Sequence, residues 1–182
     1  MKIIAVDPGN VSGVAYMEAD LPCGKDPRCG GDNECLFHGD GPYAGKVLMW
    51  RAWEDRPFEI IGAVETWISS ADTLMGTDDK LVVCESFIPR PGAHSWQPDA
   101  LYTIGALKYL CERENVEFAL QSPANAKKFS TDAKLKRIGW YIRTPDGHTN
   151  DALRHLLLAA VKIGVVAPEQ LIERSVPEGS IL

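Results

Sequence analysis

Residues 2–16 read KIIAVDPGNVSGVAY, and this stretch decides the fold that the sequence predicts. Residues 3–6 are an apolar run rich in β-branched side chains, with the length of a buried strand. The run ends at Asp7, a Pro-Gly-Asn turn follows, and residues 13–17 resemble a second strand. We therefore expect a hairpin with the carboxylate of Asp7 at the end of its first strand. A charge there needs a partner or a metal ion, unless it only caps the turn.

Strands and helices alternate after this hairpin. In order, the sequence predicts a strand at residues 46–53, a helix opening at 55–57, a strand at 80–84, a helix at 99–114, a strand at 116–120, a basic helical stretch from 122 to about 139, a helix at 150–164 and a C-terminal tail at 165–182. This order predicts an α/β fold, a mixed five-stranded sheet with helices on both faces. Its length of 182 residues predicts a single domain spanning residues 1–182.

Bulk composition excludes several classes of protein. The net charge of −6 argues against a uniformly basic nucleic-acid coat, and it suits a site that concentrates carboxylates around divalent cations. Apolar runs all fall short of the roughly 18 residues that a membrane span needs, and the N-terminus lacks the pattern of a signal peptide. We therefore expect a cytoplasmic protein with no membrane contact.

Three carboxylates stand at the ends of predicted elements. Asp7 ends the first strand, Glu85 follows the strand at 80–84, and Asp151 opens the final helix three residues after His148. If the two strands are adjacent and parallel, Asp7 and Glu85 emerge at the same end of the sheet. Two divalent metal ions about 4 Å apart would relieve the repulsion in such a cluster and could activate water against a phosphodiester. Carboxylate oxygens suit Mg²⁺ or Mn²⁺. The alternative for each carboxylate is a capping role at a loop or helix.

Three segments resemble the signature segments of RuvC-type Holliday junction resolvases, within the RNase H-like superfamily. They are IAVDPGNVSGVA around Asp7, VVCESF around Glu85 and HTNDAL from His148 to Asp151, in the same order. The resemblance implies an RNase H-like fold and a homodimer that cuts four-way DNA junctions in recombination and repair. It also implies two Mg²⁺ or Mn²⁺ ions per active site, bound by Asp7, Glu85 and Asp151. Position 148 would supply the fourth ligand, with Asp146 as the alternative.

A basic segment precedes the final helix. Its cations are Lys127, Lys128, Lys134, Lys136, Arg137 and Arg143, and Asp132 is the only acid among them. A run of one sign beside the site predicts phosphate contacts with branched DNA, and a solvated helix face is the alternative. In the loop after Glu85, Phe87 is the nearest candidate for the aromatic residue that the resolvases insert near the junction centre. Arg90 and His94 are candidate phosphate contacts.

Residues 18–45 form a predicted insertion between the second and third strands, rich in Gly, Pro, Asp and Cys. It departs from the bacterial resolvase pattern, which has a short hairpin here. Its candidate zinc ligands are Cys23, Cys29, Cys35 and His38. A structural Zn²⁺ would order a segment that has no apolar core, and unliganded thiols or a disulfide are the alternatives.

Other functions match parts of the same pattern. A broader RNase H-like nuclease acting on forks, flaps or RNA would use the same carboxylates. A non-catalytic DNA-binding module on this fold is expected to lose one or more of them. An actin-like ATPase also holds phosphate with Asp-x-Gly turns, but such proteins have two domains and a longer chain. Because all three carboxylates are present, we expect a two-metal-ion endodeoxyribonuclease.

Overall fold

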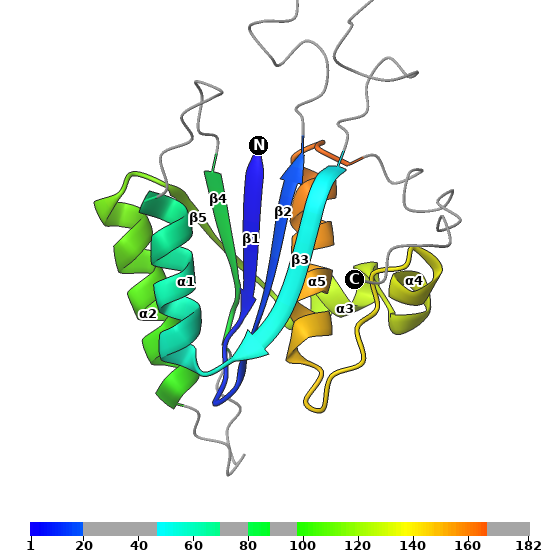
Figure 1. Ribbon diagram of the computed structural model, residues 1–182, viewed down its shortest axis with the longest axis horizontal. Helices are drawn as coiled ribbons and strands as arrows, with labels where there is room; N and C mark the ends of the chain where they lie inside the picture. The colour runs from blue at the N-terminus through cyan, green and yellow to red at the C-terminus, as the bar shows by residue number, and fades with distance from the viewer. Residues whose placement is uncertain (20–46, 70–79, 88–97, 167–182) are drawn as a thin grey trace, which may run out of the picture.

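The computed structural model describes residues 1–19, 47–69, 80–87 and 98–166 (Figure 1). In chain order, these ranges contain β1 (Lys2–Asp7), β2 (Ser12–Ala19), β3 (Val47–Asp55), α1 (Pro57–Ser69), β4 (Lys80–Glu85), α2 (Pro98–Arg113), β5 (Glu117–Gln121), α3 (Pro123–Phe129), α4 (Asp132–Arg137) and α5 (His148–Lys162). The predicted basic stretch is thus two short helices. Thr131 separates them, because its side chain caps α4 by accepting a hydrogen bond from the backbone N–H of Lys134 at 3.3 Å.

The five strands form one mixed sheet in the order β3-β2-β1-β4-β5. β1 pairs antiparallel with β2 and parallel with β4, while β3 joins β2 antiparallel and β5 joins β4 parallel. This arrangement confirms the predicted fold class, an α/β fold with a mixed five-stranded sheet. Because β1 and β4 are parallel neighbours, with Val6 paired to Cys84, both strands deliver their last residues to the same end of the sheet.

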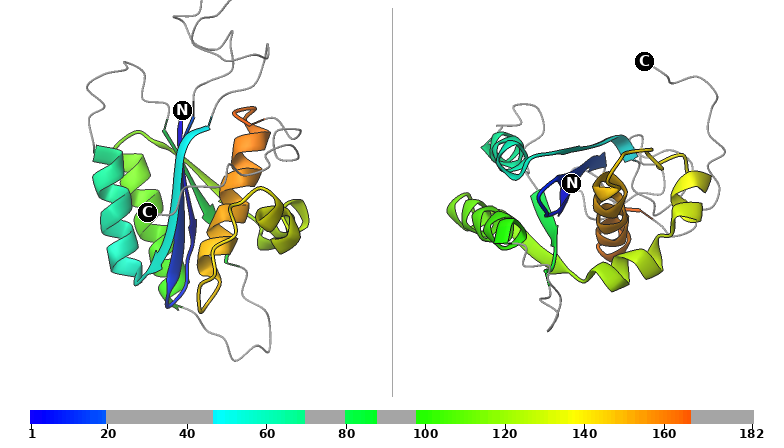
Figure 2. Two further views of the ribbon diagram at one scale, coloured as in Figure 1. Left: turned by 45° about the vertical axis from the view of Figure 1, so that its right-hand side comes forward. Right: turned by 90° about the horizontal axis from the view of Figure 1, so that it is seen from below.

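Helices cover both faces of this sheet, as the view from below shows (Figure 2). Side chains of β1 alternate between the two layers. Ile3 and Ala5 join the buried cluster that includes α5, whereas Ile4 and Val6 join the cluster that includes α1 and α2. The central strand is therefore buried on both sides, which explains its continuous apolar run.

The second strand is longer than the sequence predicted. β2 continues through Glu18 and Ala19, although the insertion was expected to begin at residue 18. The chain terminus accounts for the extra length: Met1 and Ala19 exchange two hydrogen bonds of 3.0 Å between their backbones. The remaining part of the insertion, with Cys23, Cys29, Cys35 and His38, lies outside the described residues.

The predicted tail also begins too early. Val165 and Val166 are 1% and 3% exposed and belong to the core cluster beside α5. Their backbone N–H groups donate to the carbonyl of Ala160 at 2.9 and 3.2 Å, which closes the end of the helix. Residues 167–182 lie outside the described ranges.

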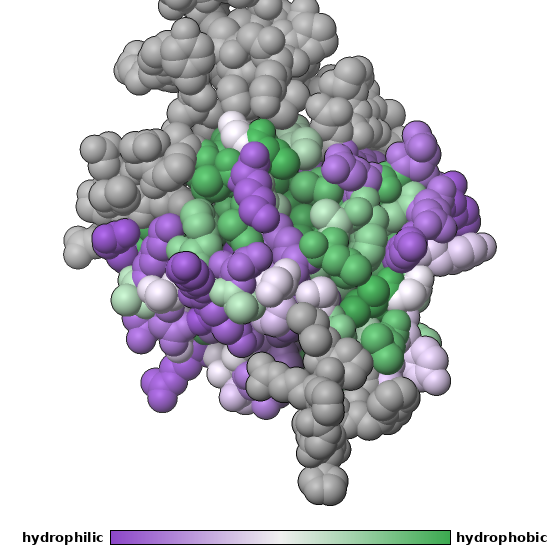
Figure 3. Space-filling view, turned by 180° about the vertical axis from the view of Figure 1, so that it is seen from behind, coloured by the Kyte–Doolittle hydropathy of each residue, from purple (hydrophilic) through white to green (hydrophobic). Residues whose placement is uncertain are grey.

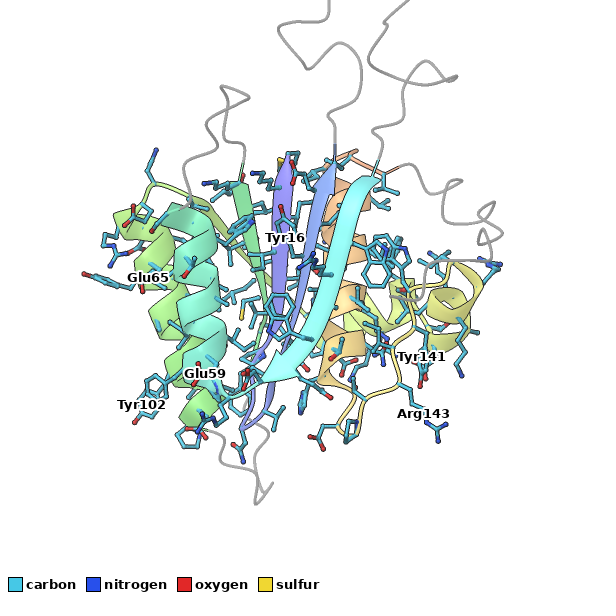
Figure 4. All side chains as sticks on the ribbon, viewed as in Figure 1. Tyr16, Glu59, Glu65, Tyr102, Tyr141 and Arg143 are labelled. Atoms are coloured by element: carbon cyan, nitrogen blue, oxygen red, sulfur yellow. The ribbon has the colours of Figure 1, made fainter. Side chains whose placement is uncertain are left out.

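The surface is divided into polar and apolar regions. Figure 3 shows hydrophobic residues gathered into a patch with hydrophilic residues around it, on the face opposite that of Figure 1. Leu120 of the edge strand β5 and Tyr102 and Tyr109 of α2 are exposed. Figure 4 shows Tyr102 extending away from the body of the molecule.

Among the helices described, none has the length and apolar content needed to cross a membrane.

Candidate active site

The candidate site lies where β1 and β4 end and α5 begins. Asp7 is the last residue of β1, Glu85 is the last residue of β4, and His148 is the first residue of α5. Nδ1 of His148 lies 2.7 Å from Oδ2 of Asp7, whose side chain is buried. The structure therefore brings the first and third sequence segments into direct contact.

Glycine in β2 makes this contact possible. A Cβ atom on Gly13 would lie 2.1 Å from the backbone oxygen of His148, so only glycine lets the start of α5 pack this closely on the hairpin. Glu54 of β3 also contacts the start of α5, where its Oε2 accepts a hydrogen bond from the backbone N–H of Thr149 at 3.4 Å. An acidic group at this point suits the positive end of the helix dipole. Together these contacts fix His148 over Asp7.

Electrostatic coupling joins the three predicted carboxylates. Burial raises the pKa of Asp7, and the carboxylates of Glu85 and Asp151 raise this pKa further, while His148 lowers it. The pKa of His148 is raised, chiefly by its hydrogen bond to Asp7, and burial opposes that effect. The charges on Asp7 and His148 therefore depend on each other, as expected where a carboxylate and an imidazole share a buried site.

Glu85 contacts a histidine that the sequence analysis did not single out. Nε2 of His155 lies 2.8 Å from Oε2 of Glu85, and Nδ1 lies 3.0 Å from Oε1 of Gln121. His155 is on α5, seven positions after His148, and its side chain is 1% exposed. That spacing places it on the same helix face as His148. The spacing was the available signal, but its carboxylate partner could be identified only from the fold.

Asp151 is held by two basic side chains. Arg154 donates to Oδ1 from one amino group, and Nζ of Lys127 lies 3.1 Å from Oδ2. Arg154 also contacts Asp132 and donates from Nε to the carbonyl of Ser130 at 2.9 Å. The guanidinium group thus ties the first turn of α5 to the end of α3 and the start of α4.

The residues fit a divalent cation in chemical type. Three carboxylates and one imidazole are hard or borderline donors, which suits Mg²⁺ or Mn²⁺, and the buried charge of Asp7 would be stabilised by a cation. Within the described ranges, however, no three His, Cys, Asp or Glu side chains gather closely enough to hold a metal ion together. Each carboxylate instead faces a basic group: His148 at Asp7, His155 at Glu85, and Arg154 with Lys127 at Asp151.

The predicted DNA-binding lysines differ in their surroundings. Lys127 pairs with Asp151 across the site, and Lys128 and Arg137 are exposed. Nζ of Lys134 lies 4.0 Å from the centre of the Phe129 ring, and burial lowers its pKa. Nζ of Lys136 lies 4.5 Å from the centre of the Tyr141 ring. Lys127 is therefore the basic residue of this segment that lies nearest to the carboxylates.

A pocket of about 370 Å³ separates the basic helices from the start of α5. Its lining includes Lys127, Asp132, Tyr141, Asp151 and Arg154. Figure 4 shows Tyr141 and Arg143 on the segment that connects α4 to α5. The pocket is lined by Asp151, so a bound chain could contact both the basic helices and this carboxylate.

The loop after Glu85 is described only at its start. Phe87 is half-buried two residues after Glu85. Arg90 and His94, the candidate phosphate contacts, lie outside the described residues. The alternative ligand Asp146 is exposed and lines the pocket, but His148 is the residue that contacts Asp7.

No protein-family model matches this chain, and no curated protein matches its sequence. Among solved structures, RuvC of Thermus thermophilus is similar at 14% identity and a TM-score of 0.49, covering 91% of this chain and 98% of that chain. T. thermophilus RuvC in complex with a Holliday junction substrate is similar at 13% identity and a TM-score of 0.48, with 91% and 98% covered. A Ppx/GppA family member of Aquifex aeolicus is similar at 13% identity and a TM-score of 0.39, covering 76% of this chain and 40% of that chain. The function proposed below therefore rests on the residues of this chain.

Proposed function

We propose that the protein is a metal-dependent endodeoxyribonuclease that cuts DNA at four-way junctions. The observation that carries the proposal is that Asp7 and Glu85 end parallel neighbouring strands at one end of the sheet, where Nδ1 of His148 lies 2.7 Å from Oδ2 of Asp7. These residues come from three sequence segments that resemble the resolvase signatures. Burial raises the pKa of Asp7, and Glu85 and Asp151 raise it further, so the ionised form of Asp7 is costly to maintain unless a cation stabilises it.

Asp7, Glu85, Asp151 and His148 would hold two Mg²⁺ or Mn²⁺ ions. When bound, such ions activate water and stabilise the leaving oxygen of a phosphodiester. The protein side chains prepare the site for them. Burial excludes water from Asp7, and Gly13 lets His148 approach its carboxylate. Two ions would also neutralise the carboxylates beside a DNA phosphate, which those groups otherwise repel.

Lys127 and Lys128 are proposed to bind the DNA backbone next to the site. Both lie in the last turn of α3, and Lys127 reaches Asp151. Lysine contacts to phosphate add affinity without reading sequence, as a structure-selective nuclease requires. In this role Lys127 would leave Asp151 for a phosphate when DNA and metal ions bind.

The resemblance also implies a homodimer, and α2 is the proposed interface. Tyr102 and Tyr109 are 74% and 63% exposed on this helix, on the side of the sheet opposite α5. Exposed tyrosines are enriched where protein surfaces meet. A dimer of this kind would present two active sites to the two opposed strands of a junction.

The test is cleavage of labelled four-way junction, forked duplex and linear duplex in Mg²⁺, Mn²⁺ or EDTA. The proposal predicts symmetric nicks in the junction alone, which EDTA abolishes. Similar cleavage of forks would identify a broader structure-selective nuclease. Tight junction binding without cleavage in either metal would indicate a non-catalytic DNA-binding protein and would overturn the proposal.

A further inference from the structure

We propose that His155 is a positioning residue that orients the Glu85 carboxylate toward the metal site. This inference rests on the proposed function, because it takes Glu85 as a metal ligand. The contact that carries it is the 2.8 Å approach of His155 Nε2 to Oε2 of Glu85. His155 contacts two side chains, Glu85 and Gln121.

The imidazole is anchored on both sides. Its Nδ1 atom lies 3.0 Å from Oε1 of Gln121, the last residue of β5. Gln121 is the direct register partner of Glu85, and its carbonyl accepts a hydrogen bond from the N–H of Ser86 at 2.8 Å. Because Gln121 is 8% exposed and His155 is 1% exposed, water competes little for these contacts. The ring is therefore fixed relative to the ends of both β4 and β5.

Hydrogen-bond chemistry determines the direction of the contact. An ionised carboxylate only accepts, so Nε2 of His155 must carry the proton that it shares with Glu85. The side-chain amide of Gln121 suits either charge state of the ring. Its oxygen accepts from Nδ1–H of an imidazolium, and after a half-turn of the amide its nitrogen donates to a neutral ring.

This arrangement distinguishes the two oxygens of Glu85. Oε2 is occupied by His155, whereas Oε1 has no hydrogen-bond or ion-pair partner among the described residues. The Glu85 side chain is 19% exposed, so its outer oxygen can face a ligand. A buried donor that holds one oxygen and leaves the other accessible is the usual arrangement behind a metal-binding carboxylate.

The same helix supplies the other groups at the site. His148, Asp151 and His155 stand at spacings of three and seven residues on α5, so they share one face. Their partners lie on different strands: Asp7 ends β1 and Glu85 ends β4. The helix thus aligns two strand-end carboxylates with two histidines, and His155 is the buried one.

The test compares His155→Leu, His155→Gln and wild type for Mn²⁺ binding by isothermal titration calorimetry in the absence of DNA. Glutamine retains a donor for Glu85, and leucine does not. Leu157→Val is the matched control, because Leu157 is buried on the same helix, in the core cluster against the sheet. We expect His155→Leu to weaken Mn²⁺ binding about tenfold or more, with His155→Gln within about threefold of wild type. We expect Leu157→Val to lower the melting temperature and leave Mn²⁺ affinity unchanged.

Long-range ¹H–¹⁵N spectra of the metal-free protein provide the second measurement. We expect a protonated Nε2 on His155 whose resonance shifts in Glu85→Gln. A deprotonated Nε2, or a His155→Leu protein that binds Mn²⁺ as tightly as wild type, would overturn the positioning role and leave the proposed function intact. Wild-type protein that binds no Mn²⁺ would instead overturn the proposed function, and a protonated Nε2 would then identify His155 as a structural contact only.

Discussion

The Nδ1 atom of His148 lies 2.7 Å from Oδ2 of Asp7, although 141 positions separate the two residues in the chain. The contact joins the end of the central strand to the start of the last helix. It places an imidazole beside a carboxylate that burial and two further carboxylates make difficult to ionise. Changes at this pair should therefore affect the folding stability of the protein, its binding of metal ions and its cleavage of DNA.

Asp7→Asn should change how the stability of the metal-free protein depends on pH. The folded-state pKa of Asp7 is raised above its ordinary value of 3.8, chiefly by burial, and that of His148 is raised above 6.5, chiefly by Asp7. A raised pKa contributes stability below the unfolded-state pKa, and this contribution is lost as pH rises through the folded-state pKa. Wild-type protein in EDTA should lose stability through Asp7 as pH rises above about 4, and through His148 as pH rises above about 6.5.

The variant removes the Asp7 carboxylate and the main cause of the raised His148 pKa. Thermal unfolding in EDTA should therefore show a flatter pH profile for Asp7→Asn, with a melting temperature a few degrees or more above wild type near pH 8. Mg²⁺ should then stabilise wild type more than the variant, because a ligand stabilises the folded state that binds it. Parallel pH profiles for the two proteins would contradict the burial and coupling assigned to Asp7.

Gly13→Ala should disrupt the start of α5. The added Cβ would lie 2.1 Å from the backbone oxygen of His148, and a backbone atom cannot move aside as a flexible side chain can. We expect a loss of about 1–3 kcal/mol in the free energy of unfolding and reduced cleavage, measured by urea unfolding and junction assay.

Gly62→Ala is the matched control for that change. Nothing lies within 4 Å of a Cβ at Gly62, which is in the interior of α1. Alanine there should raise the free energy of unfolding by up to about 1 kcal/mol. If Gly13→Ala were as stable and active as the Gly62→Ala protein, the proposed packing of α5 on the hairpin would be wrong.

Much of this site could be predicted because it depends on strand order. Asp7 and Glu85 each follow a short apolar run, and parallel pairing of those strands brings them to one end of the sheet. The direct contact of His148 with Asp7 needed more than pattern. The sequence predicted a helix from residue 150, but α5 begins at His148, after Gly147 in the left-handed region at φ 80°.

His155 could not be assigned a role from the sequence. A single histidine on an apolar helix face is ordinarily a core residue with satisfied hydrogen bonds, and its partners Glu85 and Gln121 are 70 and 34 positions away. The sequence also placed the start of the C-terminal tail at residue 165, too early, because contacts with the core cannot be identified from the sequence alone. Val165 and Val166 follow a helix-ending glycine, and only their contacts with the core show that the packed structure continues.

Lys128→Ala should weaken junction binding by reducing phosphate contacts. Lys128 is exposed in the last turn of α3, next to the residue that reaches Asp151. We expect a several-fold loss of affinity and a decrease of about 1 in the slope of log affinity against log salt concentration. Lys108→Ala is the control, since Lys108 lies on α2 and pairs with Glu112 at 3.9 Å. Equal effects of the two changes in a salt titration would show that binding does not involve the basic helices.

Arg154→Gln should loosen the basic helices from α5. Arg154 is 12% exposed and joins Asp151, Asp132 and the carbonyl of Ser130. Removing it leaves a partly buried carboxylate without its main partner, and we expect a loss of about 1–3 kcal/mol in urea unfolding. Asp132→Asn should cost less than about 1 kcal/mol, because Asp132 is 53% exposed. Equal losses from both changes would contradict a central role for the buried guanidinium.

The most direct test of the central claim compares wild type with Asp7→Asn on a labelled four-way junction in Mg²⁺, with cleavage and binding measured on the same samples. If Asp7 is the central metal ligand, the variant loses cleavage. It should still bind the junction as tightly as wild type or more tightly, because a negative charge near phosphate has been removed. A variant that cleaves the junction at the wild-type rate would show that the carboxylates around Asp7 are structural and that catalysis, if present, lies elsewhere.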